Sequence, residues 1–203
     1  MAQQENELKY ELSEESYHSL LGLLSQEGET LSFFNAYFVA SEDTGRRDWV
    51  LRLRRSGDEG AGELTLKVGR QTSPGAFSST EYTAEVQSDQ PADWEETEPM
   101  RVFRQEISKV AIVPQGRARN ERKIVQAPLG PVRQWEVDRT ELPNGKVCYE
   151  LEIEYPPDVS PSPEQIAGFR AELEEWMFEH SLKATASSKT KYRRFLEAVG
   201  LHR

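Results

Sequence analysis

Charged and apolar side chains alternate along most of this 203-residue chain, and that pattern restricts the folds open to it. Successive side chains of a β-strand point to opposite faces, so the alternation predicts strands with one ionic and one apolar face. The first such stretch, residues 5–11, places two acids and a base on one face: Glu5, Glu7 and Lys9. The chain is therefore expected to build a sheet whose two faces differ sharply in charge.

The same alternation predicts eight strands. They cover residues 5–11, 33–39, 48–55, 63–68, 81–86, about 118–126, 132–139 and 147–155. Many short strands separated by turn residues are typical of an antiparallel sheet or barrel. Three helices are predicted, over residues 13–24, 163–182 and 189–199. We expect an α+β fold in which an eight-stranded antiparallel sheet or barrel has helices packed outside, as a single domain over residues 1–203.

Opposite charges are sorted by strand. Bases alternate with leucines at Arg52, Arg54 and Lys67, and acids alternate with apolar residues at Glu150, Glu152 and Glu154. A sheet with its charged face in water explains this pattern without any function. If the charged faces turn inward, an eight-stranded barrel becomes a polar tunnel of about the size that encloses one small ligand.

A lipocalin-like barrel is a further possibility, because the opposite face of the same strands is apolar. It requires four leucines to face inward and the arginines to face outward. These leucines are Leu51, Leu53, Leu64 and Leu66.

The charge balance argues against a general nucleic-acid binder, since the net charge is −10 and phosphate backbones are held by broad basic surfaces. Twenty of the 25 basic residues fall within residues 46–70, 101–123 and 183–203, which favours a local anion site. No apolar run is long enough to cross a membrane, the N-terminus lacks the pattern of a secretory signal, and the single Cys148 excludes an internal disulfide. A cytoplasmic protein is expected, and the oligomeric state has no readable signal.

A triphosphate is one anion that such a tunnel would suit. Its negative charges lie close together, so its site needs several Lys or Arg side chains and usually divalent cations. Mg²⁺ prefers oxygen ligands, typically one or two carboxylates with waters and phosphate oxygens. Rows of bases and glutamates that face each other across a tunnel supply both groups.

The charged motifs occur in a fixed order along nearly the whole chain. They are Glu5-x-Glu7-x-Lys9, Trp49-Val50-Leu51-Arg52-Leu53-Arg54, Leu64-Thr65-Leu66-Lys67, Glu81, Arg122, Cys148-Tyr149-Glu150-Leu151-Glu152 and Lys189-Thr190-Lys191-Tyr192-Arg193-Arg194-Phe195. This ordered set resembles the CYTH superfamily, the triphosphate tunnel metalloenzymes. The resemblance implies an eight-stranded tunnel that hydrolyses inorganic triphosphate, or a small organic triphosphate such as thiamine triphosphate, with Mg²⁺ or Mn²⁺.

The resemblance also implies roles for individual residues. Phosphate oxygens would be bound by Lys9, Arg52, Arg54, Lys67, Arg122 and Lys191. A substrate-bridging metal would be held by Glu5, Glu7, Glu150 and Glu152. Glu81, with Glu85 as a possible helper, would hold a second metal that activates water, and the expected catalytic residues are Glu7, Glu81 and Lys191. Arg119 is a further candidate phosphate ligand on the loop side of Arg122.

Some assignments stay open. Thr83 occupies a position where some relatives carry another acid, which favours a non-catalytic module for polyphosphate or a phosphorylated metabolite as the alternative function. Adenylate cyclase activity is a second alternative by family analogy. Lys189 is an alternative to Lys191, and Asp138 either reaches the tunnel or is a solvated acid. The acidic run 93–98 is expected to be a solvated loop or a helix start.

Overall fold

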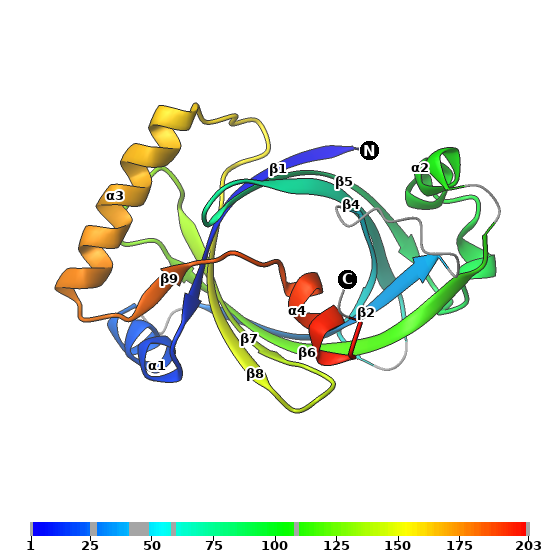
Figure 1. The fold of residues 1–203 in the computed structure, drawn as a ribbon, viewed down its shortest axis with the longest axis horizontal. Helices are drawn as coiled ribbons and strands as arrows, with labels where there is room; N and C mark the ends of the chain where they lie inside the picture. Colours follow the sequence, from blue (N-terminus) through cyan, green and yellow to red (C-terminus); the bar gives the residue numbers. More distant parts are fainter. Residues whose placement is uncertain (1, 25–27, 41–48, 58–59, 108–109, 202–203) are drawn as a thin grey trace.

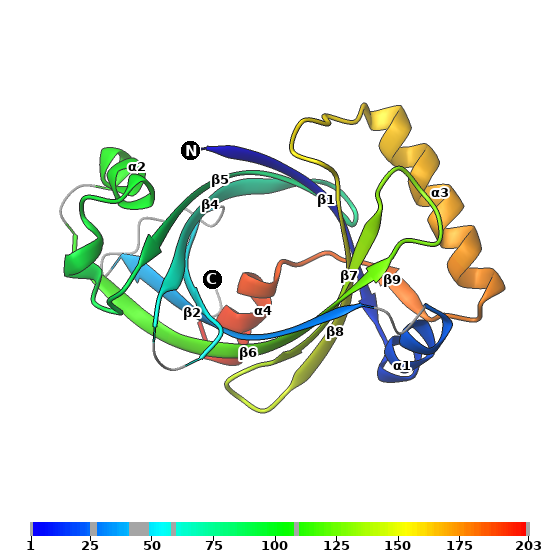
Figure 2. The same ribbon diagram turned by 180° about the vertical axis from the view of Figure 1, so that it is seen from behind.

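The computed structural model describes residues 2–24, 28–40, 49–57, 60–107 and 110–201. In this part of the chain, eight antiparallel strands close into a barrel with four α-helices outside it (Figure 1, Figure 2). The strands are β1 (Gln3–Leu12), β2 (Glu29–Ala40), β3 (Trp49–Arg55), β4 (Gly62–Ser73), β5 (Ala76–Val86), β6 (Ile112–Gln126), β7 (Gln134–Glu141) and β8 (Val147–Glu154). Their order is β5-β4-β3-β2-β6-β7-β8-β1, and pairing between β5 and β1 closes the barrel. The predicted fold class is confirmed.

The three predicted helices are present as α1 (Glu14–Leu23), α3 (Pro163–Glu179) and α4 (Lys191–Ala198). Ser13 caps α1, and Ser162 with Gln165 forms a capping box at the start of α3. Two elements were missed: α2 (Glu98–Glu106) and the short β9 (Ala184–Ala186), which pairs with β1. No helix in the described ranges is both long and apolar enough to span a membrane.

The acidic run 93–98 holds the end of a short 3₁₀ helix (Pro91–Trp94) and the first residue of α2. Trp94 is completely buried, although acids surround it in the sequence. A helix start was therefore the correct one of the two expectations, but the run also carries a core residue.

The apolar faces of β3 and β4 point out of the barrel, where α2 covers them. Leu51, Leu53, Leu64 and Leu66 pack with Trp94, Met100, Phe103 and Ile107. Arg52 and Lys67, at the alternating positions, face the interior. This register excludes the lipocalin-like barrel, which needs the leucines inside. Burial of each leucine side chain contributes about 1.5–3 kcal/mol relative to exposure, so α2 is what makes the outward apolar face stable.

A second apolar core covers the outer face of β1, β7 and β8. Leu8, Tyr10, Trp135, Val137, Leu151 and Ile153 pack there against side chains of α1 and α3. The helices supply Leu20 from α1 and Phe169, Leu173 and Met177 from α3. Helices on the outside therefore bury the apolar faces and leave the barrel interior to the charged ones.

The last helix, α4, is placed differently from α1, α2 and α3. It lies across one end of the barrel instead of along the wall (Figure 1, Figure 2). Its Tyr192 and Phe195 rings lie 5.2 and 4.6 Å from the ring of Tyr37, which lines the barrel interior. This end of the barrel is therefore narrowed by α4.

A glycine in the β6–β7 connection sets how closely α3 can approach. Gly130 has φ +93°, and a Cβ atom there would lie 2.1 Å from Cε2 of Phe169 in α3. Gly145, in the β7–β8 turn, has a similar φ of +80° but open space around it. Both positions favour glycine, yet only Gly130 is also limited by a neighbouring helix.

We expect Gly130→Ala to lower the free energy of unfolding more than the matched Gly145→Ala control, by about 1–3 kcal/mol, the usual cost of overpacking. Urea unfolding of both variants measures the difference. Equal losses would contradict the described packing of α3 on this connection.

Candidate active site

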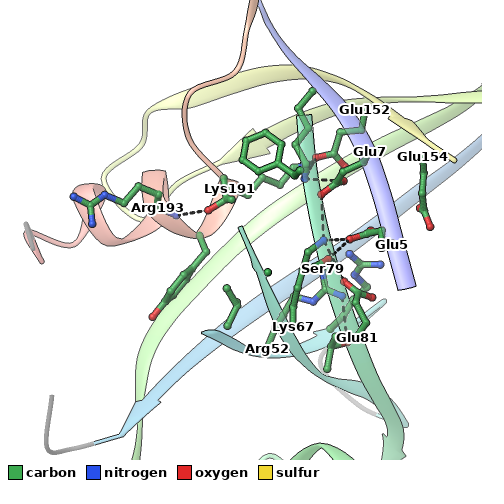
Figure 3. Close-up of a pocket in the computed structure, with 18 of the residues that line it drawn as sticks. Glu5, Glu7, Arg52, Lys67, Ser79, Glu81, Glu152, Glu154, Lys191 and Arg193 are labelled. Atoms are coloured by element: carbon green, nitrogen blue, oxygen red, sulfur yellow. Dashed lines mark hydrogen bonds and ion pairs between the residues drawn. The ribbon is translucent and has the colours of Figure 1, made fainter. Parts of the chain in front are cut away.

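A cavity of about 820 Å³ lies inside the barrel and is lined by charged side chains. Six of the seven basic residues predicted to bind phosphate line it: Lys9, Arg52, Arg54, Lys67, Arg122 and Lys191. Four of the predicted metal ligands line it as well: Glu5, Glu7, Glu81 and Glu152. The inward alternation on several strands, together with the first residue of α4, brings these distant parts of the sequence together (Figure 3).

Lys67 lies among three of the predicted metal ligands. Its Nζ contacts Glu5 and is 3.2 Å from Glu7 and 3.3 Å from Glu81 (Figure 3). The hydroxyl of Ser79 donates to Glu5 at 2.9 Å. Burial works against the charge on Lys67, but the carboxylates outweigh it and raise the pKa of the ammonium group. An ammonium ion thus occupies the space between three carboxylates.

Glu152 is the centre of a second set of ion pairs. Its carboxylate accepts from Lys9 at 2.8 Å, from Lys191 at 2.6 Å and from Arg122 at 2.7 Å. Burial disfavours its ionised form, yet Lys191, Lys9 and Arg122 together hold the pKa of the Glu152 carboxyl well below its usual range. Three predicted phosphate-binding residues are therefore held by one carboxylate.

Asp138 is completely buried and belongs to the same network. It accepts from Arg122 Nε and Nη2 at 2.8 and 2.7 Å and lies 2.6 Å from Lys191 Nζ. Burial opposes its charge, but Lys191 and Arg122 lower the pKa of the carboxyl. Of the two interpretations of Asp138, the structure shows the inward one. Glu136 lies two residues before Asp138, on the same face of β7. It also contacts Arg122 and lines the cavity.

Arg52 and Arg54 have fewer ion pairs among the described residues than the other four bases. Arg52 Nη2 lies 3.6 Å from Glu63 Oε1 and donates to Thr65 Oγ1 at 3.2 Å. Arg54 donates to Asn35 Oδ1 at 3.2 Å and lies 4.3 Å above the Phe33 ring, and the described residues give it no carboxylate within ion-pair distance. Burial, with Arg52 and Arg122 nearby, lowers the pKa of Arg54 to about 10. Among the described residues, the buried Nε of Arg52 has no hydrogen-bond partner. A bound anion would satisfy both side chains.

Two predicted site residues lie away from the cavity. Arg119 points to the outer face and is exposed, because its neighbours Asn120 and Arg122 take the inward positions. Glu150 faces the interior side of β8 but is covered by α4, where it pairs with Arg194 at 2.5 Å, and it is not part of the cavity lining.

Lys191 and Lys189, the two candidate lysines near the C-terminus, have different surroundings. The Lys191 side chain is 14% exposed and is aimed at Asp138 and Glu152. Lys189 is 44% exposed and pairs with Glu197 at 2.9 Å. Lys191 is therefore the lysine that joins the buried charge network.

Thr83 lines the cavity on β5, as its place between Glu81 and Glu85 predicts. Glu85, the possible helper of Glu81, is exposed and lies outside the cavity lining. Glu81 is therefore the single acid that β5 contributes to the cavity.

Sequence reasoning missed Glu154 as a site residue. It lines the cavity opposite Glu7 in the β1–β8 ladder. Burial, then Glu5, Glu136 and Glu7, raise the pKa of Glu154 to about 7. The signal was present in the alternation of Glu150, Glu152 and Glu154, but the sequence does not say which of the three lies near Glu5 and Glu7.

The carboxylates around Lys67 fit a hard divalent cation by chemistry. Glu5, Glu7, Glu81 and Glu154 offer the oxygen ligands that Mg²⁺ and Mn²⁺ accept. As the described side chains stand, no group of three acids, histidines or cysteines is arranged to hold a metal. Lys67 fills the space between three of them, so a metal would bind there only after its ammonium group moves.

A closed antiparallel barrel with bases and carboxylates around an inner cavity is the triphosphate-tunnel fold. The family model of the CYTH domain matches residues 3–195, and the chain belongs to this family. No curated protein matches it in sequence.

Solved structures share this fold. A putative adenylyl cyclase from Hippeastrum, described as having a dominant triphosphatase activity, is 24% identical with a TM-score of 0.78, and the match covers 95% of each chain. A putative adenylate cyclase from Bacillus halodurans is 21% identical with a TM-score of 0.66, and the match covers 96% of this chain and 98% of the other. At these identities the likeness shows the fold alone.

We expect Asp138→Asn to lower the free energy of unfolding by about 3–5 kcal/mol, the range for removing one partner of a buried ion pair. The reason is that Arg122 and Lys191 would share fewer negative charges in a buried site. Urea unfolding is the measurement. The matched control is Glu141→Gln, whose partially exposed pair with Arg139 spans 3.8 Å and is worth at most about 1 kcal/mol. Similar losses in both variants would contradict the described network.

Proposed function

We propose that the protein is a metal-dependent triphosphatase. It cleaves the terminal phosphate of inorganic triphosphate, or of a small organic triphosphate such as thiamine triphosphate, inside the barrel. The observation that carries the proposal is the convergence of six basic side chains on one cavity, one of which, Arg54, has no carboxylate within ion-pair distance among the described residues. A compact polyanion is the ligand that such a cavity favours. The cytoplasmic location stays a prediction.

The basic residues of the cavity neutralise the phosphate chain. Lys9, Arg122 and Lys191 are oriented by Glu152, and Arg54, which has no carboxylate within ion-pair distance among the described residues, is open to a phosphate oxygen. Phosphoryl transfer depends mainly on positioning and on stabilising charge on the phosphate oxygens. Preorganised bases inside the barrel serve both purposes, so these residues favour cleavage as well as binding.

Glu5, Glu7 and Glu81, with Glu154 beside them, would hold Mg²⁺ or Mn²⁺. A bound divalent ion supplies further charge neutralisation and a more acidic water for attack. In the structure, the ammonium group of Lys67 forms ion pairs with Glu5, Glu7 and Glu81. A phosphate group entering the cavity offers Lys67 a new partner and leaves the carboxylates available.

The related Hippeastrum protein supports hydrolysis over cyclisation, since it is described by a dominant triphosphatase activity although it is named a putative adenylyl cyclase. A non-catalytic polyphosphate-binding module is the second candidate. It is favoured by Thr83, which lines the cavity where another acid would strengthen a second metal site.

We expect Glu7→Gln and Lys67→Ala each to lower kcat/KM for phosphate release from inorganic triphosphate by about 10²-fold or more, a typical loss for a preorganised charged group. Colorimetric phosphate release with Mg²⁺ or Mn²⁺ is the assay. Lys183→Ala is the matched control, because Lys183 is 78% exposed and is not part of the cavity lining. Full activity in both site variants would refute the assignment.

Thermal unfolding separates catalysis from binding alone. Triphosphate at about a hundred times its Kd adds about 2.7 kcal/mol to the free energy of unfolding. For a chain of this size, this raises the Tm by about 5–10 °C. We expect this rise to be larger with divalent metal. A rise without phosphate release would support the binding module, and no rise with or without metal would count against both candidates.

A further inference from the structure

A set of polar side chains, all buried except the exposed Glu11, joins α4 to the end of the barrel. We call it the anchor cluster; it consists of Glu11, Glu150, Ser187 and Arg194. Arg194 Nη1 donates to Glu150 Oε1 at 2.5 Å, and its Nη2 donates to Ser187 Oγ at 2.7 Å and lies 2.8 Å from Glu11 Oε1. Arg194 and Glu150 are 7% and 1% exposed. The guanidinium therefore connects α4 with β8, with β1 and with the segment that precedes the helix.

Ser187 extends these contacts into the barrel wall. It is completely buried. Its backbone N–H donates to the carbonyl of Lys9 at 2.8 Å, and its carbonyl accepts from Gly75 N and Gln71 Nε2, both at 3.0 Å. The Lys9 N–H in turn donates to the Gly75 carbonyl at 2.7 Å. The anchor cluster is thus bonded to the strand that carries Lys9, one of the cavity residues.

Lys191 depends on this placement of α4. It is the first residue of the helix, three positions before Arg194, so both side chains lie on the same side of the helix. Its Nζ is 2.6 Å from both Asp138 and Glu152 and 3.5 Å from Glu150. A lysine in the first turn is disfavoured by the helix dipole, and an eight-residue helix is not stable alone. Tertiary contacts must hold both in place.

We infer that Arg194 is a positioning residue which, with Glu150 and Ser187, fixes α4 across the barrel end so that Lys191 reaches the phosphate cavity. The role of Lys191 rests on the proposed function; the attachment of α4 does not. Glu150 then acts through Arg194, not as a metal ligand. Its Oε1 accepts from Arg194, its buried Oε2 lies 3.5 Å from Lys191 Nζ without a hydrogen-bond partner among the described residues, and it does not line the cavity.

The geometry requires arginine. One nitrogen of the guanidinium is used for Glu150 and the other for Ser187 and Glu11. A lysine has a single ammonium group and cannot span both sets. Arg194→Lys is therefore expected to be intermediate between the wild type and Arg194→Met.

The first test compares KM for inorganic triphosphate in a double-mutant cycle. We expect Arg194→Met to raise KM about tenfold, as for the loss of one charge-assisted contact. In a Lys191→Met background the same change should alter KM by less than about twofold, because the residue it positions is absent. A loss from general destabilisation would be the same in both backgrounds and would overturn the inference. Arg139→Met, on the outer face with a weak pair to Glu141, is the control and should leave KM unchanged.

The second test separates Glu150 from the metal site. Calorimetric titration with Mn²⁺, without substrate, should give Glu150→Gln an affinity within about twofold of the wild type, whereas Glu7→Gln should weaken it by about tenfold or more, as for a lost metal ligand. Equal weakening in the two variants would show that Glu150 is a metal ligand and would overturn its assignment to the anchor cluster.

The third test does not depend on hydrolysis. Amide hydrogen exchange over residues 191–198 should be about tenfold faster in Arg194→Met, with the barrel strands unchanged, since only the attachment of α4 is weakened. If Arg194→Met fails to fold, Arg194→Lys and Glu150→Gln are measured in the same way. Unchanged exchange in α4 would overturn the inference. Faster exchange in a protein without triphosphatase activity would support the anchor cluster while the proposed function failed.

Discussion

Glu152 lies inside the barrel with the side-chain nitrogens of Lys9, Lys191 and Arg122 within 2.8 Å of its carboxylate. Charges removed from water are costly unless each has partners. Glu152 and Asp138 together bind cations from β1, β6 and α4, and this sharing is what allows a charged interior to exist. Because charges take most inward positions, the apolar side chains at the alternate positions of β1, β3, β4, β7 and β8 are buried outside the barrel. The barrel is thus polar inside and apolar on much of its outer face. Helices are needed to cover that apolar outer face.

The helices then divide into two roles. α1, α2 and α3 cover apolar faces of the wall, as Leu51 and Leu64 under α2 and Leu151 near α3 show. α4 instead narrows one end of the barrel and adds a cation to the interior. Among the interior cations, Arg54 has no carboxylate within ion-pair distance in the described part of the chain, and burial with the nearby Arg52 and Arg122 lowers its pKa to about 10. An anion that enters the cavity would therefore find Arg54 without a carboxylate partner.

Alternation was enough to predict the strands and which side chains share a face, because a period of two fixes this. That the face with the bases turns inward, into a closed barrel, followed only from the resemblance to the CYTH superfamily. Together they placed Arg52, Arg54 and Lys67 correctly on the cavity lining. Alternation did not predict α2, because the few apolar residues of this helix can be recognised as core residues only from the leucines of β3 and β4 that they cover. It also did not separate Glu150 from Glu154: both share a face, but α4 covers one and leaves the other beside Glu5. How far along the barrel axis a residue lies, and what covers it, depends on tertiary contacts. The two-residue period of a strand does not predict these contacts.

The central claim is that the inward-facing bases form a site for a chain of phosphates. Calorimetric titration of the wild type with phosphate, pyrophosphate and triphosphate, with Mg²⁺ held constant, tests it most directly. Each additional phosphate meets further bases along the cavity, so affinity should rise with chain length, by about tenfold or more per phosphate if each gains one charge-assisted contact. Equal affinity for phosphate and triphosphate, or no binding of either, would contradict the account.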